Sequence, residues 1–268
     1  TAGDSGQEWA GLPPRDDVPL PEYPFDKDPQ EMDDAEKQLF RDWASQRNRL
    51  YNFNAKSMSR RLQVERTIQL AEDYAKYPEF YFVWQLDFRS RKYPVESFMS
   101  PQVADWGKAL IEFNNGFPIN DYDDAAWLAI HGANLYGNDK VSFNERIEWA
   151  WNQEDDIVAS AENPLDYTWW TTADKPWQFL SWCFEWYGLL RDGWGFYTHL
   201  PCSADGSCNG LQHLSAILLD ERGGRATNLL PSETPADIYT DVAIRAEQLV
   251  RQDADAGHEL ARKCLEFG

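Results

Sequence analysis

The sequence predicts an α+β fold that is rich in helices and contains a few short strands. Much of the chain consists of segments with apolar residues at helical spacing, separated by clusters of Pro and Gly. Short aromatic and β-branched runs supply the candidate strands. Hydrophobic residues make up 43% of the 268 residues and aromatic residues 15%, so the chain can bury a large core. Together with the absence of an internal repeat, this pattern is typical of an α+β architecture.

The N-terminal part divides into an acidic and a basic stretch. Residues 1–32 are rich in Pro, Gly and acidic residues, and we expect them to form an extended acidic lead-in. Residues 33–51 predict a helix, and a second helix is expected to begin near Arg60. Residues 1–40 carry eleven acidic and three basic residues, whereas residues 41–70 carry seven basic and two acidic residues. The basic stretch is either an anion-binding surface or a solvated helix face.

The middle of the chain predicts one strand and several helices. The aromatic run over 80–84 predicts a buried strand. Ser142 and Glu145 form a capping box, which predicts a helix that extends to about Ser160. Residues 177–190 predict an aromatic helix in the core. Further helices are expected over 103–114 and 123–136. The side chains interpreted as core are His131, His199, Trp149, Trp151, Trp169, Trp170, Trp177, Trp182 and Trp186.

The C-terminal part predicts one strand and two helices. Residues 196–205 read as a strand, and a short helix that ends at Gly223-Gly224 follows it. The last helix is expected to begin at Thr234, with Pro235 in its first turn. The apolar residues expected to define the helix faces are Leu211, Leu214 and Leu218 in the first helix and Ile238, Val242, Ala246 and Leu249 in the second.

Composition limits the classes of protein. The formal net charge of −20 opposes nucleic-acid binding, so only a local basic surface can drive it. The four Cys residues have no CxxC spacing, which argues against a zinc site and a dense disulfide framework. We see no signal peptide and expect no association with a membrane. The 13 Trp and the acidic charge are also typical of a glycosidase or carbohydrate-binding protein, but nothing pairs two carboxylates as glycoside hydrolysis requires.

One segment, residues 205–213, stands out for its chemistry. It begins with Asp205-Gly206 at the end of the predicted strand, where a carboxylate is held rigidly. Because Gly206 has no Cβ, a backbone carbonyl can approach whatever the carboxylate binds. Hard oxygen ligands of this kind suit Mg²⁺. The alternative is an ordinary turn, for which Asp-Gly is a common sequence.

This segment resembles the first catalytic motif, motif A, of the single-subunit DNA-dependent RNA polymerases of phages and mitochondria. Other motifs of that family match in order between about residue 33 and residue 250, and their wording is closer to the phage branch. The matching segments are 59–61, 87–93, 131–134, 139–140, 168–170, 223–234 and 237–239. The resemblance implies a helix-rich fragment of the polymerase right-hand fold with a few strands of the palm.

The resemblance also implies roles for individual residues. Asp205 would bind both catalytic Mg²⁺ ions, two in the complete enzyme, and Gly206 would contribute its carbonyl. Lys140 and Tyr239 would contact the incoming nucleotide, although Tyr239 can also be read as a partly exposed helix tyrosine. The residues implied in nucleic-acid binding are Arg60, Arg61, Arg89 and Arg91. For Arg60 and Arg61, a plain surface role is the alternative.

The implied partners are a DNA template, an RNA transcript and nucleoside triphosphates, in the cytoplasm of an infected bacterium rather than in a mitochondrion. Residues 33–268 would then form part of the catalytic domain, truncated before motif B and the second catalytic Asp. No His-Asp-Ser motif is present, and we interpret the chain as part of a longer protein. The alternative is a non-catalytic, nucleic-acid-binding remnant or one chain of a split polymerase, whose second chain carries the missing motifs.

A local departure from the family concerns Ser90, which stands where the family has Gly between the two arginines. If the backbone there has a positive φ, Ser90 is strained.

Overall fold

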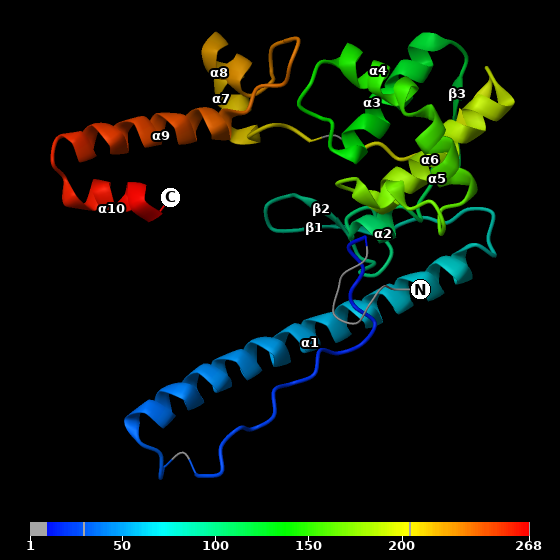
Figure 1. The fold of residues 1–268 in the computed structure, drawn as a ribbon. Helices are drawn as coiled ribbons and strands as arrows, with labels where there is room; N and C mark the ends of the chain where they lie inside the picture. The colour runs from blue at the N-terminus through cyan, green and yellow to red at the C-terminus, as the bar shows by residue number, and fades with distance from the viewer. Residues whose placement is uncertain (1–9, 29, 204, 268) are drawn as a thin grey trace. The chain divides into compact units, whose positions relative to one another are not determined.

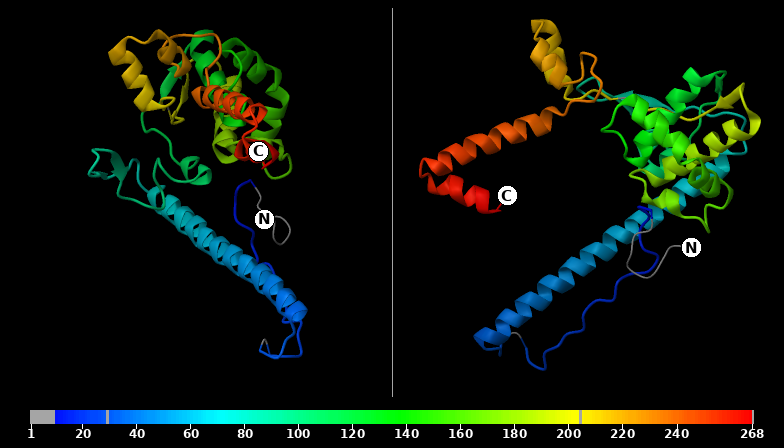
Figure 2. Two further views of the ribbon diagram at one scale, coloured as in Figure 1. Left: turned by 90° about the vertical axis from the view of Figure 1, so that its left-hand side faces the viewer. Right: turned by 45° about the horizontal axis from the view of Figure 1, so that its top comes forward.

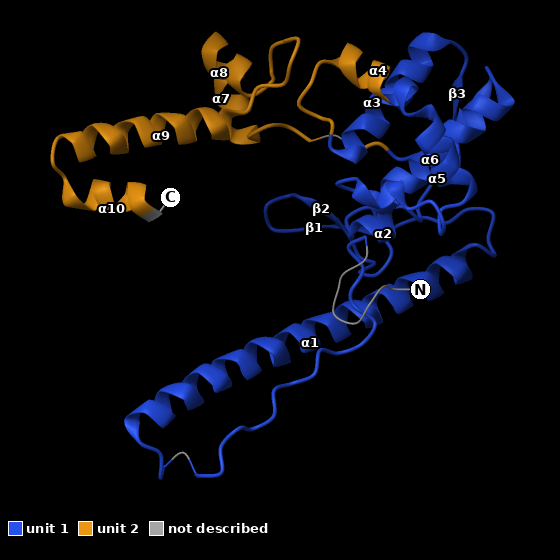
Figure 3. Ribbon diagram, viewed as in Figure 1, with its two compact units in different colours: residues 1–137, 150–201 blue, residues 138–149, 202–268 orange. Residues whose placement is uncertain are grey.

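The computed structural model describes residues 10–28, 30–203 and 205–267. They form two compact units, shown in blue and orange in Figure 3. Unit 1 comprises residues 1–137 and 150–201, and unit 2 comprises residues 138–149 and 202–268. The fold is rich in helices with a few short antiparallel strands, which confirms the predicted α+β class. Within the described residues, no helix has both the length and the apolar character that crossing a membrane requires.

Unit 1 contains most of the helices and the strands (Figure 1). Its elements are α1 (Asp34–Tyr74), β1 (Trp84–Leu86), β2 (Lys92–Pro94), α2 (Asp105–Lys108), β3 (Phe117–Ile119), α3 (Tyr122–Tyr136), α5 (Glu154–Glu162), the 3₁₀ helix η1 (Trp169–Thr172), α6 (Pro176–Asp192) and β4 (Phe196–Thr198). The helix α4 (Phe143–Asn152) begins in unit 2 and ends in unit 1. Unit 2 continues with α7 (Asn209–Leu218), α8 (Glu221–Ala226), α9 (Ile238–Asp255) and α10 (Glu259–Phe267).

The helix α1 runs without a break over 41 residues, so the prediction of two separate helices was wrong. Its sequence contains neither Gly nor Pro, and nothing between residues 51 and 60 ends the helix. A capping box starts it: the Asp33 carboxylate accepts a hydrogen bond from the Glu36 amide, and the Glu36 carboxylate accepts one from the Asp33 amide.

Residues 10–28 of the lead-in run beside α1 in an extended conformation (Figures 1 and 2). The Asn54 side chain exchanges two hydrogen bonds with the backbone of Val18, at 2.9 and 2.8 Å. The Trp43 indole N–H donates to the Glu22 carbonyl at 2.8 Å, and Pro14 is fully buried. These contacts hold the lead-in against the helix, although its composition is acidic and polar.

The core of unit 1 is built around α6, which packs against α2, α3, α5 and η1. Phe179, Trp182 and Trp186 follow one another at helical spacing, are fully buried, and stack with centroid separations of 5.3 and 5.2 Å. The Trp182 indole donates to the Leu128 carbonyl of α3 at 2.8 Å. A Cβ on Gly132 would lie 2.1 Å from the Trp182 ring, so the close contact between α3 and α6 requires glycine. The predicted aromatic core helix is confirmed.

The two pairs of strands are short and antiparallel. β1 pairs with β2, and β3 pairs with β4. The buried strand predicted over 80–84 was wrong, because the strand begins only at Trp84 and its residues are exposed. Tyr81 is 80% exposed, and Phe80 instead stacks on Tyr74 of α1 at 4.8 Å. A hairpin of two strands without a covering layer leaves its aromatic side chains exposed.

The helix predicted over 103–114 is much shorter, since α2 ends at Lys108. The Phe113 amide donates to the His199 carbonyl at 2.9 Å, so it does not make the hydrogen bond that a continued helix would require. The helix predicted over 123–136 is confirmed by α3. The capping box of Ser142 and Glu145 is also present, but the helix that follows is divided at Gln153 into α4 and α5.

In the C-terminal part of the chain, the structure corrects three boundaries. The strand predicted over 196–205 stops at Thr198. Gly223 and Gly224 lie inside α8, and α7 ends earlier, at Leu218. It is followed by Leu219, which adopts a left-handed conformation with φ of 53°. The helix α9 begins at Ile238 rather than Thr234, and it is followed by α10.

The apolar residues of α9 also differ from the prediction. Val242 is 60% exposed and Leu249 is 50% exposed, and Ala246 is exposed as well. The spacing of these residues predicted the helix correctly, but not the burial of its face.

Candidate functional site

Asp205 lies in an irregular segment before α7, and its side chain is exposed. The expectation that a strand end fixes this carboxylate was wrong, because β4 ends at Thr198. The local contact of Asp205 is with the next residue: its Oδ1 accepts a hydrogen bond from the Gly206 amide at 2.8 Å. The carboxylate is therefore oriented by its own loop and faces solvent.

Gly206 is constrained by the first turn of α7. A Cβ at this position would lie 2.2 Å from Asn209 Oδ1 and 2.8 Å from Gln212 Oε1. Both atoms are the ends of flexible side chains, so a larger residue would require these two side chains to move. The absence of a side chain thus lets two amide oxygens approach the backbone beside Asp205.

Tyr239 lies in the first turn of α9 and is 67% exposed. Asp237 caps this helix, since its carboxylate accepts hydrogen bonds from the amides of Tyr239 and Thr240 at 3.0 and 3.3 Å. A hydrogen bond with the Cys208 side chain raises the pKa of the Tyr239 hydroxyl. Because Cys208 lies three residues after Asp205, this contact joins Tyr239 to the Asp205 loop.

Lys140 precedes α4 and also belongs to unit 2. Its ammonium group is 79% exposed and lies 3.4 Å from the Asp139 carboxylate. The pKa of Asp237 is lowered first by its hydrogen bonds with Thr240 and also by the positive charge of Lys140. Asp205, Lys140 and Tyr239 thus all belong to unit 2, and Lys140 and Tyr239 both act on the Asp237 cap region of α9.

Arg89 and Arg91 lie in and just after the turn of the β1–β2 hairpin, in unit 1. The Asp87 carboxylate accepts hydrogen bonds from the amides of Arg89 and Arg91 at 2.8 and 2.9 Å, and from the Arg89 guanidinium at 3.0 and 2.9 Å. The hydrogen bond from the Arg91 amide is the first cause that lowers the pKa of Asp87. Ser90 has a φ of 61°, so the strained conformation expected for this residue is present. Asp87 thus shapes the turn that displays both arginines.

Arg60 and Arg61 lie on α1, also in unit 1. Arg60 is exposed, whereas the Arg61 side chain is 23% exposed and is held by the lead-in. Its guanidinium lies 2.6 Å from the Asp17 carboxylate and donates to the Pro14 carbonyl at 3.0 Å. The acidic lead-in therefore competes for one of the four arginines predicted to bind nucleic acid.

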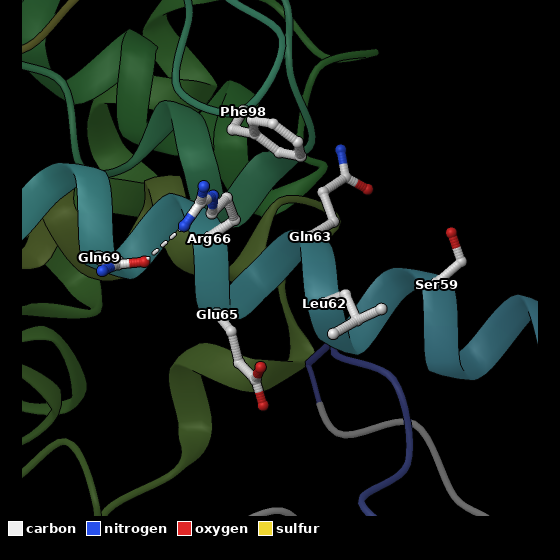
Figure 4. A pocket seen from close by; sticks show the side chains of 7 residues that line it. All are labelled: Ser59, Leu62, Gln63, Glu65, Arg66, Gln69 and Phe98. Carbon is white, nitrogen blue, oxygen red and sulfur yellow. Dashed lines mark hydrogen bonds between the residues drawn. The ribbon is translucent and has the colours of Figure 1, made fainter.

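The same stretch of α1 carries a shallow depression (Figure 4). Within it, Arg66 donates a hydrogen bond to Gln69 at 2.9 Å. Its lining residues are Ser59, Leu62, Gln63, Glu65, Arg66, Gln69 and Phe98. All belong to unit 1, so the depression adds no residue to the group around Asp205.

The Asp205 carboxylate is one candidate ligand for Mg²⁺. Across the described parts of the chain, no group of three or more His, Cys, Asp or Glu residues could hold a metal ion. Mg²⁺, however, is commonly bound by one or two carboxylates together with substrate phosphates and water. The exposed Asp205 carboxylate matches that kind of ligand set.

Some residues that contact the candidate site residues were not predicted from the sequence. Asp237 was expected inside the helix, although an Asp directly before an apolar periodic run is a typical N-cap signal. The role of Cys208 as the partner of Tyr239 has no signal in spacing or composition. The same holds for Asp17, which reaches Arg61 across 44 positions of the chain.

Comparison with known proteins identifies the family to which this chain belongs. A family model described as DNA-dependent RNA polymerase matches residues 120–267, more than half of the chain. The chain therefore belongs to the DNA-dependent RNA polymerase family, as the ordered motifs predicted.

Its relatives in that family include single-subunit polymerases of phages and mitochondria. The DNA-directed RNA polymerase of Enterobacteria phage T3 is 39% identical over 249 residues, which cover 93% of this chain and 28% of the phage protein. T7 RNA polymerase of Escherichia phage T7 is 37% identical over 250 residues, with the same two coverages. DNA-directed RNA polymerase 1, mitochondrial, of Arabidopsis thaliana is 35% identical over 260 residues, covering 95% of this chain and 26% of that protein. The chain thus spans little more than a quarter of their length.

Proposed function

We propose that the chain is part of an enzyme that adds nucleotides from nucleoside triphosphates to the 3′ end of an RNA on a DNA template. The observation that carries this proposal is the grouping of Asp205, Lys140 and Tyr239 in unit 2 of a chain that belongs to the polymerase family. A carboxylate, a cation and an exposed ring are the side chains that a metal-bound nucleotide needs for recognition.

Each residue has a separate task in this proposal. Asp205, assisted by the Gly206 carbonyl, would hold the Mg²⁺ ions, which when bound would neutralise charge on the attacking and leaving oxygens. Lys140, whose ammonium group is exposed, attracts the triphosphate. Tyr239 lines the nucleotide site with a ring that is held by the capped end of α9.

Nucleic acid is assigned to the arginines of unit 1. Arg89 and Arg91 are displayed by the Asp87 turn and contact phosphates, for which the guanidinium fork is suited. Arg60 and Arg61 contribute from α1. Since the relatives include phage proteins at 39% and 37% identity, we propose the cytoplasm of an infected bacterium as the site of action.

The test uses a complete polymerase in which this chain replaces the matching segment of the phage T3 enzyme. Asp205→Asn should leave the melting temperature and template binding nearly unchanged, because Asn is almost isosteric and Asp205 is exposed. The elongation rate should fall on the order of 10³-fold, since a preorganised electrostatic group typically contributes about 10²–10³-fold. Asp255→Asn, in another exposed Asp of unit 2, is the matched control.

An Asp205→Asn enzyme that elongates within about tenfold of its parent would contradict the metal assignment. The isolated chain provides a second arm, in which we expect no RNA synthesis on a primed template with Mg²⁺, because one catalytic Asp cannot complete the two-metal site. Synthesis by the isolated chain would refute that expectation. If the chimaera is inactive but the isolated chain binds an RNA–DNA hybrid, the non-catalytic binding role is favoured instead.

A further inference from the structure

Asn228, between α8 and α9, joins the two parts of unit 2 that carry the proposed site. Its side-chain Nδ2 donates to Ser207 Oγ at 3.0 Å and to the Ala236 carbonyl at 2.8 Å. Its Oδ1 accepts a hydrogen bond from the Ala236 amide at 2.7 Å. One amide group thus uses both of its donor hydrogens and its acceptor oxygen within the unit.

The partners of Asn228 lie next to functional residues on both sides. Ser207 follows Gly206 in the loop that carries Asp205. Ala236 directly precedes Asp237, the cap of the helix that presents Tyr239. A displacement of the Asn228 amide would therefore move the carboxylate and the tyrosine ring relative to each other.

The backbone around Asn228 is fixed independently of its side chain. Its φ is 59°, a left-handed conformation that Asn tolerates better than most residues. The preceding Thr227 is fully buried, its hydroxyl donates to the Gly223 carbonyl at 2.8 Å, and its own carbonyl accepts from Gln212 Nε2 of α7 at 2.7 Å. The amide of Asn228 therefore projects from a turn that is anchored on both α7 and α8.

We propose that Asn228 is a positioning residue that holds the Asp205 loop and the Tyr239 helix at the separation needed for nucleotide addition. This inference rests on the proposed function, because it assigns Asn228 to the same site. Asn228 acts through Ser207 on the metal-binding carboxylate and through Ala236 on the nucleotide-binding ring. Removing the hydrogen bond to Ser207 and removing those to Ala236 should therefore have different effects on the kinetics.

The experiment uses the T3 chimaera and measures kcat, KM for nucleoside triphosphates and melting temperature. Asn228→Gly retains the left-handed backbone without strain and removes all three hydrogen bonds. We expect kcat/KM to fall about 10²-fold, since misplacement by about 1 Å can cost that much. Ser207→Ala removes only the link to the Asp205 loop and should lower kcat alone. Asn228→Asp keeps the acceptor for the Ala236 amide, so its KM should lie closer to the parent value than that of Asn228→Gly.

The matched control is Leu219→Gly, which changes another left-handed position close to these helices, in an exposed side chain without a proposed role. It should leave kcat and KM unchanged.

The proposal is overturned if Asn228→Gly keeps kcat/KM within about threefold of the parent value. It is also overturned if the activity falls only in proportion to the folded fraction while KM stays constant. If Asn228→Gly does not fold, Ser207→Ala decides through kcat. Asp205→Asn separates the two proposals, because full activity there would defeat the proposed function whatever Asn228 does.

Discussion

Helices α6 and α9 both carry apolar side chains at helical spacing, but their surroundings differ. In α6 of unit 1, Phe179, Trp182 and Trp186 are fully buried among α3, α5 and η1. In α9 of unit 2, Val242 and Leu249 remain 60% and 50% exposed. The burial of an apolar face depends on a second element that covers it, and only α6 has several such elements in its own unit.

The two units are therefore stabilised in different ways. Unit 1 has a dense aromatic core, whereas unit 2 depends on side-chain hydrogen bonds such as those of Asn228, Gln212 and Asp237. The residues proposed for nucleotide addition all lie in unit 2. Chemistry in this molecule is thus assigned to the unit with the smaller apolar core.

The largest difference should appear when one apolar residue of each helix is truncated. Trp182→Ala should lower the free energy of unfolding by about 3–5 kcal/mol, because it leaves a cavity and removes the hydrogen bond to Leu128. Leu249→Ala should change it by about 0.5 kcal/mol or less, since the side chain is already half exposed. Urea unfolding followed by circular dichroism measures both. Equal losses for the two variants would mean that the face of α9 is as well covered as that of α6.

A smaller effect is expected from His131, on α3 of unit 1. Burial, together with the charge of Lys175, lowers its pKa from 6.5 to about 4. As the pH falls, the His131 imidazole of the unfolded chain is protonated before that of the folded chain. The contribution of neutral His131 to the free energy of unfolding is therefore complete above pH 6.5. It is lost as the pH falls from 6.5 to about 4, by about 3 kcal/mol in total.

The measurement compares unfolding free energies at several pH values for the parent chain and His131→Gln. The variant should lack the loss between pH 6.5 and about 4. Burial raises the pKa of Glu185 in the same unit, and its contribution changes in the opposite direction, so the difference between the two proteins is the informative quantity. His213→Gln, in an exposed histidine of unit 2, is the control and should keep the parent profile. If the free energy of unfolding of His131→Gln depends on pH as it does in the parent chain, the His131 imidazole is not responsible for the loss of stability.

The smallest effect concerns nucleic-acid binding, which we expect to be weak and salt-sensitive because of the net charge of −20. Replacing Arg60, Arg61, Arg89 and Arg91 with Ala should reduce the affinity for an RNA–DNA hybrid about tenfold and flatten its salt dependence. The control replaces four exposed arginines of unit 2, namely Arg222, Arg225, Arg245 and Arg251, and changes the net charge equally. Fluorescence anisotropy over a salt series measures both. Equal losses would show that only total charge matters.

Sequence periodicity predicted the helices better than their ends and surroundings. The helix over 123–136 and the aromatic core of α6 follow from local spacing, which is why both predictions were correct. The strand expected to hold Asp205 failed because strand pairing depends on distant partners, and β3 pairs with only three residues of β4. The family motifs supplied Asp205, Lys140 and Tyr239, but the contacts of Cys208 and Asn228 arise from tertiary structure alone.

The continuous helix α1 also has a mechanical consequence. With 41 residues, it is a rigid arm about 60 Å long. A tilt of about 5° at one end moves the other end by about 5 Å over that length. The lead-in, which is attached at Asn54 and Arg61, braces this arm along its side. A displacement near Asp34 is therefore transmitted along α1 to the segment after Tyr74.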